Sequence, residues 1–385
     1  MMNKDLIIIG AGPSALALAK ALAHSRLNIT LIEQQSQQQC AQPDYDGRDI
    51  ALTHQSLAIL KQFDIWSKLQ AHPIAAAKVQ DGHSPYTLNF CEHTQPLGFL
   101  VSNHHLRQAL YETVAPQPNV NFIWQTKVQQ VIKSELGYRV TLCDGRQFDT
   151  PLLVAADSRF SATRRQVGIS ATIKDFARTA IVCRMRHQLA HQCTAHECFH
   201  YGHTLAILPL SEGESSIVVT ANTDKAADLL ALSDDEFNRF ITNALAHSLG
   251  DMQLSTARFS YPLVGVFAAY FSKAHVALLG DAAVGMHPVT AHGFNLGLVG
   301  ATRLAKVISE AIDKNDTYYS EQTLAAYHSE QQKEARMMYY GTNGIVQLFT
   351  SENPPAKLAR KILLRFSNHF PPLKQAITAK LTQYG

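Results

Sequence analysis

Hydrophobic residues occur along this chain in short continuous runs and at helical spacings, a combination typical of an α/β protein. The first 35 residues predict a buried strand at 6–9, a glycine-rich turn, a helix over about 14–24 and a second strand at 27–32. Beyond them we expect the following elements: a meander of strands at 120–124, 128–133 and 138–143 that turns at Asp144-Gly145, short strands over 176–262 with a polar helix near 233–248, and helices over 296–312 and 321–340.

The apolar run at the N-terminus also resembles an export signal. Lys4 precedes it, and Ala21-Leu22-Ala23 resembles a cleavage site. The glycines and the proline at 10–13 interrupt the run where a signal would be most helical, and Lys20 breaks its end. These features favour a strand and turn of the folded protein, and elsewhere no uncharged apolar run is long enough to predict a transmembrane span.

The turn at Gly10-Ala11-Gly12-Pro13-Ser14-Ala15 has the G-x-G-x-x-G/A pattern of dinucleotide-binding folds. Gly10 permits the tight turn, Gly12 lets the backbone approach a pyrophosphate, and the small Ala15 lets helix and strand pack closely. The helix that follows directs its free N–H groups at the phosphates. Glu33 ends the second strand, where an acid accepts hydrogen bonds from a ribose hydroxyl. The alternative is a glycine-rich turn in an ordinary βα unit.

Two later segments indicate which dinucleotide is bound. Gly280-Asp281-Ala282-Ala283 follows a buried strand and precedes Pro288 and Gly293-Phe294-Asn295-Leu296-Gly297, which opens another helix. This arrangement resembles the second FAD motif of the flavoprotein aromatic hydroxylases, G-D-A-A-H-x-x-x-P-x-x-G-Q-G-x-N-x-G. The segment from Ala156-Asp157-Ser158 to Arg164 resembles that family's A-D-G-x-x-S-x-x-R. The resemblance implies FAD as the cofactor, NADH or NADPH as the reductant, and O₂ as the oxidant.

Within that family the chain most resembles the hydroxylases of ubiquinone biosynthesis, of the UbiH, UbiF and UbiM type. Residues 46–52 resemble their D-x-R-x-I-A-L segment, 105–110 their L-R-x-A-L helix start, and 205–210 their A-L-L-P-L strand. Residues 285–293 most resemble the UbiM branch. The resemblance implies a polyprenylated aromatic substrate, hydroxylated by a flavin C4a-hydroperoxide.

The chain departs from the family pattern at three positions. Val284 replaces the usual His after G-D-A-A, His292 replaces the Gln of G-Q-G, and Ser158 replaces the Gly of A-D-G. The resemblance places the first two positions near the flavin. We therefore expect the fold to be kept, whereas the substrate, the redox tuning or the reaction can differ from those of other members.

The resemblance also assigns roles to individual residues. Asp281 is expected to hydrogen-bond the ribityl chain, with turn capping as the alternative, and Asp157 has either a cofactor-facing or a structural role. No catalytic side chain is identified, because the chemistry belongs mainly to the flavin. The expected FAD-binding residues are Gly10, Gly12, Pro13, Ser14, Ala15, Glu33, Arg48, Arg107, Asp157, Asp281, Pro288, Gly293, Phe294, Asn295 and Leu296, and the expected substrate-side residues are His200, Pro209, His287 and His292.

Composition narrows the class of protein further. The net charge is +3 and charged residues make up only 17%, which offers no broad cationic face for nucleic acid. The six cysteines include no C-x-x-C pair, so we expect reduced thiols in a cytoplasmic protein. His196, Cys198 and His200 alternate on a predicted strand, but their spacing matches no structural zinc pattern. We predict no metal site, and take this strand face as a border of the active site or as an ordinary histidine-rich face.

The predicted architecture is α/β: a discontinuous Rossmann-like FAD-binding domain with an inserted β-rich substrate domain. We assign 1–75, 99–175 and 263–345 to the FAD-binding domain, 76–98 and 176–262 to the substrate domain, and 346–385 to a C-terminal helical segment. That segment carries basic residues opposite apolar ones, which is typical either of a helix packed on the body or of peripheral contact with the inner face of a membrane.

The predicted activity is FAD-dependent hydroxylation of the aromatic ring of a polyprenylated ubiquinone precursor. The alternatives are hydroxylation of a small soluble aromatic compound, a flavin reductase or dehydrogenase that does not use oxygen, and a non-catalytic FAD-bearing subunit of a quinone-biosynthesis complex.

Overall fold

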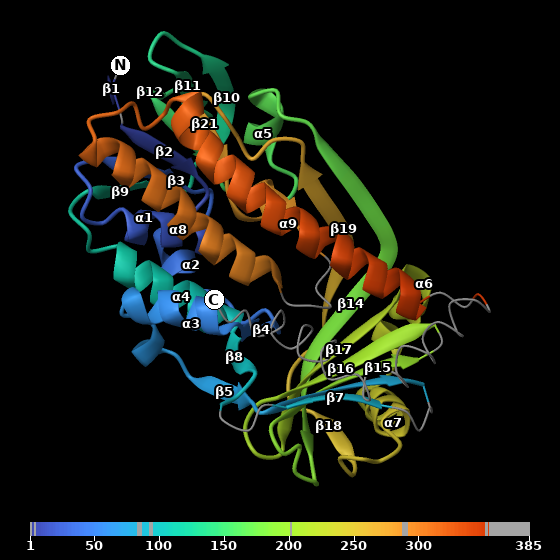
Figure 1. Ribbon diagram of the computed structural model, residues 1–385. Helices are drawn as coiled ribbons and strands as arrows, with labels where there is room; N and C mark the ends of the chain where they lie inside the picture. Colours follow the sequence, from blue (N-terminus) through green and yellow to red (C-terminus); the bar gives the residue numbers. More distant parts are fainter. Residues whose placement is uncertain are drawn as a thin grey trace.

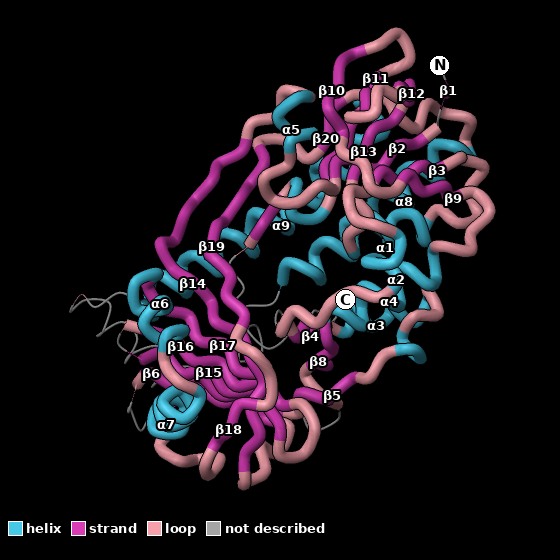
Figure 2. Tube along the Cα trace, turned by 180° about the vertical axis from the view of Figure 1, so that it is seen from behind, coloured by secondary structure: helices cyan, strands magenta, loops and turns pink. Residues whose placement is uncertain are grey.

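The structure is a computed structural model that describes residues 2–3, 5–82, 87–91, 95–200, 202–286, 292–350 and 353. It has two parts, a helix-covered parallel sheet and a larger, mainly antiparallel sheet (Figure 1). The long strands β14 (Ala171–His187) and β19 (Phe259–Ala268) run from one part to the other, and helix α9 (Glu321–Thr350) runs alongside them (Figures 1 and 2).

The first part is built on a six-stranded sheet in the order β20-β21-β13-β2-β3-β9. All its neighbouring strands are parallel except β20 and β21. The predicted strand–turn–helix–strand at the N-terminus is confirmed, because β2 and β3 are fully buried and joined by α1. Its elements are β2 (Leu6–Ile9), α1 (Pro13–Ala21), β3 (Ile29–Ile32), β9 (Val120–Ile123), β13 (Leu152–Ala155), β20 (Ser272–Lys273) and β21 (Val276–Leu278).

The predicted meander is wrong in one strand. β9 pairs in parallel with β3, while the antiparallel neighbours of β11 are β10 and β12, with the expected turn at Gly145 between β11 and β12. Local patterning identifies a strand without identifying its partner, and here the burial of Val120 against the central sheet decides. The smaller sheets consist of β1 (Met2–Asn3), β10 (Val128–Lys133), β11 (Tyr138–Leu142) and β12 (Gln147–Thr150), and of β4 (Asp49–Leu52), β5 (Ala71–Ile74) and β8 (Gly98–Ser102).

The second part is a nine-stranded sheet in the order β22-β19-β14-β17-β16-β15-β6-β7, with β18 paired to β14. Strands from 76–91 join strands from 171–268 through the parallel pairing of β6 with β15. The domain division remains a prediction, and its boundaries at 175 and 262 fall inside β14 and β19. The remaining strands are β6 (Ala76–Asp81), β7 (Thr87–Cys91), β15 (Thr194–His200), β16 (His203–Pro209), β17 (Glu214–Asn222), β18 (Met252–Leu254) and β22 (Val284–Gly285).

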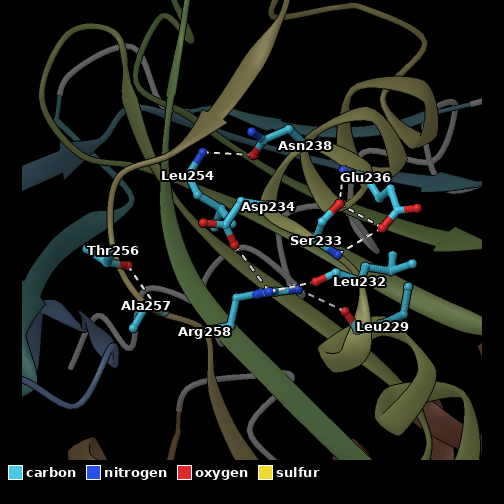
Figure 3. Close-up of polar contacts among 10 residues, drawn as sticks. All are labelled: Leu229, Leu232, Ser233, Asp234, Glu236, Asn238, Leu254, Thr256, Ala257 and Arg258. Atoms are coloured by element: carbon cyan, nitrogen blue, oxygen red, sulfur yellow. Dashed lines mark hydrogen bonds and ion pairs between the residues drawn. The ribbon is translucent and has the colours of Figure 1, made fainter.

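Helices α6 (Thr223–Ala231) and α7 (Asp234–Ala244) cover one face of this sheet and enclose its apolar core. Arg258 secures the junction between them, because its guanidinium donates to the carbonyls of Leu229 and Leu232, at 3.1 and 2.8 Å (Figure 3). Ser233 and Glu236 form a capping box that starts α7 (Figure 3). The opposite face of the sheet therefore faces the first part of the molecule.

The remaining helices lie on the first part. Helix α8 packs against α1, and α9 packs in turn against α8. Both extend beyond their predicted limits of 296–312 and 321–340, and among the described residues no helix is long and apolar enough to cross a membrane. These helices are α2 (Gln37–Ala41), α3 (His54–Gln62), α4 (Asn103–Val114), α5 (Ala162–Gln166) and α8 (His292–Asp313), with short 3₁₀ turns at Trp66–Lys68 and Gly280–Ala282.

Candidate cofactor and substrate site

The three glycine- and aspartate-containing motifs meet at one edge of the parallel sheet. β2, β13 and β21 are adjacent and parallel, so their carboxyl ends place the turns after Ile9, Ala155 and Leu278 side by side. Gly10 lies in this group with a φ of +100°, and a Cβ added to it would lie 2.5 Å from the carbonyl oxygen of Ala156. Only glycine suits a turn that combines this conformation with so close an approach. The carboxyl edge of a parallel sheet is where α/β folds bind ligands.

The glycine-rich turn leaves open space in front of helix α1. Gly12 is the N-cap of α1 and has no atom within 4 Å of where its Cβ would stand. The side chain of Ser14 instead faces α8 and the 280 turn, since Cβ atoms on Gly280 and Gly297 would collide with its hydroxyl. Ala15 is fully buried. The turn therefore divides into a packed side, at Ser14 and Ala15, and an accessible side, at Gly12 and the helix N-terminus.

Glu33 is held at the end of β3 by the turn itself. Its carboxylate accepts hydrogen bonds from the backbone N–H groups of Ala11, at 2.7 Å, and Gln35, at 2.8 Å. Arg107, on α4, donates to the side-chain oxygen of Gln35 at 3.2 Å. Glu33 and Arg107, assigned to the same cofactor from distant segments, thus both form hydrogen bonds with Gln35.

Asp157 mainly caps a helix. Its carboxylate accepts bonds from the Ser161 hydroxyl and from both the backbone N–H and the hydroxyl of Thr163, at 3.0 and 2.9 Å. Ser158 has a φ of +77°, which explains why the family pattern has glycine at this position. Arg164 is buried and donates to the carbonyl of Ala282 at 2.9 Å, tying this turn to the Gly-Asp turn. These contacts of Asp157 are all within the protein and agree with its structural role.

Asp281 forms an ion pair with Arg159, at 2.8 Å between Nη2 and Oδ2. Arg159 also donates to the carbonyl of Val264 at 2.9 Å, so it anchors Asp281 to β19. Sequence reasoning missed Arg159, which falls on an unspecified position of the A-D-G-x-x-S-x-x-R pattern. Asp281 remains partly exposed, with 38% of its side chain accessible, and can still accept hydrogen bonds from a ligand.

The start of α8 is anchored by Asn295. This buried side chain donates to the Ala51 carbonyl at 2.8 Å and accepts from the Thr53 N–H at 3.1 Å. Leu296 is buried, whereas Gly293 has open space where a Cβ would stand. Phe294 lies between them, packed against the main core. His287 and Pro288 lie outside the described residues.

His292 stands at the first position of α8, where the family has Gln. Its Nδ1 atom is buried and has no hydrogen-bond partner among the described residues, which omit 287–291, and burial lowers the pKa of the ring. A buried polar atom without a partner beside an open glycine indicates a place for a polar ligand group. Val284, the other departure, is buried in β22 beside β19.

Arg48 lies away from the carboxyl edge of the parallel sheet, at the junction between the first part and the second. It pairs with Asp46 at 2.5 Å and stacks over the ring of Tyr261 on β19. Asp46 has a pKa below its usual value, because its hydrogen bonds with Arg48 and Asn103 outweigh the opposing effect of burial. Nearby, Arg184 of β14 pairs at 2.6 Å with the fully buried Asp49 of β4. Arg48 and Arg184 thus help to join the two parts.

These features fit an FAD molecule. The open backbone at Gly12 suits a pyrophosphate, Glu33 and Asp281 are hydrogen-bond acceptors for hydroxyl groups, and the start of α8 offers backbone N–H groups beside the buried His292 ring. A dinucleotide of this kind needs this spread of donors and acceptors along one sheet edge.

Comparison with known proteins gives the family. Residues 3–340 match the family described as FAD binding domain. The ubiquinone hydroxylase UbiM of Neisseria meningitidis is 45% identical over 99% of this chain and 85% of its own length. The chain belongs to the ubiquinone hydroxylase family of FAD-dependent monooxygenases. The predicted family and cofactor are therefore confirmed.

Other family members and solved structures agree. The ubiquinone hydroxylase UbiL of Rhodospirillum rubrum is 30% identical over 96% of this chain and 87% of its own length. The p-nitrophenol 4-monooxygenase PnpA of Pseudomonas putida shares the fold, with a TM-score of 0.77, 16% identity and 99% of both chains covered. So does PqsL of Pseudomonas aeruginosa, a probable FAD-dependent monooxygenase, at 0.74, 18% identity, and coverage of 88% of this chain and 94% of its own.

Two predicted substrate-side residues lie on the strands β15 and β16. His200 stacks on His203, whose ring contacts Phe240 of α7, and Pro209 is a buried residue at the end of β16. His200 therefore shares the sheet face covered by α6 and α7, and the role of both residues in substrate binding stays a prediction. The Sγ of Cys198 lies 3.1 Å from Nε2 of His196, but the described part of the chain contains no three-residue group suited to a metal ion.

Proposed function

We propose that this protein hydroxylates the aromatic ring of a polyprenylated ubiquinone precursor, using O₂ and NADH or NADPH. The observation that carries the proposal is the meeting of the Gly10, Asp157 and Asp281 turns at one sheet edge, in a chain 45% identical to a ubiquinone hydroxylase. FAD, when bound, would supply the redox chemistry: it accepts electrons from the nicotinamide and activates oxygen.

The protein's own residues hold and orient that cofactor. Gly12 and the N-terminus of α1 bind the pyrophosphate, Glu33 and Asp281 accept hydrogen bonds from hydroxyl groups, and Arg159 keeps Asp281 in place. Asn295 fixes the start of α8, so that its free N–H groups face the ring system of the flavin, where they stabilise negative charge. We keep Pro13, Arg48, Arg107, Gly293 and Phe294 in the proposed cofactor site and give Ser14, Ala15, Asp157 and Leu296 packing roles around it.

The substrate lies between the two parts of the molecule. An apolar cluster there contains Ile74, Leu97 and Ala51 from the first part and Phe199 and Ala195 from the second. Apolar side chains at this junction exclude water and suit contact with an aromatic ring that carries an isoprenoid chain. His292 is the proposed polar group near that ring, and His287, the other candidate from the sequence, lies outside the described residues. We also propose that the segment 346–385 makes peripheral contact with a membrane or with a quinone-biosynthesis complex. Most of this segment lies outside the described residues.

The test is the quinone profile, by mass spectrometry, of cells that lack this gene and are grown in air. We expect ubiquinone to fall and a precursor that lacks one hydroxyl group to accumulate. Reintroduction of the gene should restore the profile, and an Asp281→Ala gene should not. An unchanged profile, in cells without a second hydroxylase, would contradict the quinone assignment. Restoration by an Asp281→Ala protein that lacks FAD would instead indicate a scaffold role.

A further inference from the structure

The face of the large sheet opposite α6 and α7 is directed at the proposed substrate space. Along β15, Cys198 belongs to the core under the helices, whereas its neighbours Ala195 and Phe199 belong to the cluster shared with the first part. Side chains alternate between faces along a strand. Glu197 therefore projects from the same face as Ala195 and Phe199.

The immediate neighbours of Glu197 on this face are apolar. The register places Val79 of β6 on one side and Ala206 of β16 on the other. Val79, Ala195 and Phe199 belong to the same cluster as Ala51, whose carbonyl is held by the Asn295 side chain. The Glu197 face is thus connected, through Ala51, to the start of α8, where the flavin ring is proposed to lie.

Glu197 has no hydrogen-bond or charge partner among the described residues, and it retains partial exposure although dense protein surrounds it. The charged or titratable groups on the same side include Asp81 at the end of β6, Arg184 with its partner Asp49, His72 of β5, Tyr45, and Glu214 of β17, whose charge acts on both His72 and Arg184. Burial raises the pKa of Glu197 to about 8. A carboxyl group that dense protein surrounds without a partner is costly, and such a group marks a candidate functional site.

No histidine or lysine of β15 or β6 lies on the same sheet face as Glu197 among the described residues. His196 and Lys78 are register partners on the opposite face, where the His196 ring contacts Gln80 and Cys198. Neither supplies the positive charge that would hold an ordinary carboxylate here. Because Glu197 retains partial exposure, water or a ligand that enters between the two parts is left to hydrogen-bond its carboxyl group.

We propose that Glu197 accepts the proton of the phenolic hydroxyl of the substrate, an inference that rests on the proposed function. The phenolic O–H bond breaks, its electron pair stays on the phenolate oxygen, and the proton moves to a carboxylate oxygen of Glu197. The phenolate ring is richer in electrons and is attacked more readily by an electrophilic oxygen. After the new C–O bond forms, the C–H proton at the attacked carbon passes to water and its electron pair restores the aromatic ring, while the Glu197 proton returns to the oxygen from which it came.

The experiment compares wild type, Glu197→Gln, Glu197→Asp and the control Glu212→Gln as FAD-loaded proteins. Glu212 is exposed in the turn between β16 and β17, so its substitution makes the same chemical change in the same sheet without touching the proposed site. The probe is 2-prenylphenol, a phenol that carries one isoprene unit. Difference absorbance on binding reports phenolate formation, and product analysis reports hydroxylation.

For wild type and Glu212→Gln, we expect the bound probe to form phenolate at pH values well below the pKa of the free phenol, which is about 10. We also expect the rate of hydroxylation to rise with pH through about 8. Glu197→Gln should bind the probe within about threefold, leave it neutral, and lose about 100-fold in kcat, as general-base removal does. Glu197→Asp should recover part of the loss.

Two results would overturn the inference in different ways. A Glu197→Gln protein with wild-type phenolate absorbance and kcat would refute the role of Glu197 and leave the proposed function standing. A wild-type protein that neither binds nor hydroxylates 2-prenylphenol or a longer-chain homologue would refute the function and the role together.

Discussion

The paired glycines of the first turn make separable predictions for folding and for FAD binding. Gly12 has a φ of −72° and a ψ of 175°, which any residue can adopt, and nothing lies within 4 Å of its Cβ position. Gly12→Ala should therefore cost less than about 1 kcal/mol in unfolding free energy, mainly through the poorer N-cap. The added methyl group would occupy the space of the pyrophosphate, so we expect FAD affinity to fall at least tenfold, or about 1.4 kcal/mol.

Gly10→Ala should affect the fold instead. The left-handed backbone costs about 1–2 kcal/mol for an L-residue, and contact with the Ala156 oxygen 2.5 Å away adds about 1–3 kcal/mol of overpacking. Gly145→Ala is the matched control, because its φ is +87° but no atom lies within 4 Å. We expect the control to lose only the conformational part, about 1–2 kcal/mol.

The assays are urea unfolding of the FAD-free proteins and titration with FAD followed by flavin fluorescence. Wild-type FAD affinity in Gly12→Ala would show that the pyrophosphate does not lie at this turn. Equal stability losses in Gly10→Ala and Gly145→Ala would refute the close approach of Gly10 to Ala156.

Three further variants test the structure around the cofactor. Asn295→Ala leaves the Thr53 N–H and the Ala51 carbonyl without partners, so urea unfolding should show a loss of about 2–4 kcal/mol, and a wild-type value would refute the anchoring role. Ser158→Gly relieves a φ of +77° and should raise the unfolding free energy by about 1 kcal/mol, and any decrease would contradict the strain. Burial lowers the pKa of His196 to about 4, so the unfolded chain binds the extra proton between pH 6.5 and 4, and His196 should lower the stability by at most about 3 kcal/mol as the pH drops through this window. Because burial also lowers the pKa of other histidines, His196→Gln should show a smaller fall in stability, and a fall equal to that of wild type would contradict the shift.

Sequence predicted the parts of this site that local chemistry specifies. The Gly10 turn, the acid at Glu33 and the Gly-Asp turn at 280 each have a short pattern whose physical purpose is visible without a structure. The strand at 120–124 was placed in the wrong sheet, because its partner β3 lies far away in sequence and pairing is decided by tertiary packing.

Arg159 and Glu197 could not be predicted for related reasons. Arg159 acts through Asp281 and the Val264 carbonyl, which lie more than 100 residues away, and no local spacing predicts such contacts. On β15 the alternating His196, Cys198 and His200 drew attention to one face, while the single acid between them lies on the other. The relevant signal, one carboxylate among apolar positions, gains meaning only when the faces of the sheet are known.

We propose that this protein inserts one oxygen atom from O₂ into a prenylated phenol. The most direct test incubates the FAD-loaded protein with NADH or NADPH, ¹⁸O₂ and the phenol, and analyses the product by mass spectrometry. We expect a hydroxylated product with one ¹⁸O atom, formed by wild type and lost with Gly12→Ala at limiting FAD. Oxidation of the nicotinamide with the phenol recovered unchanged, for every prenylated phenol offered, would contradict it.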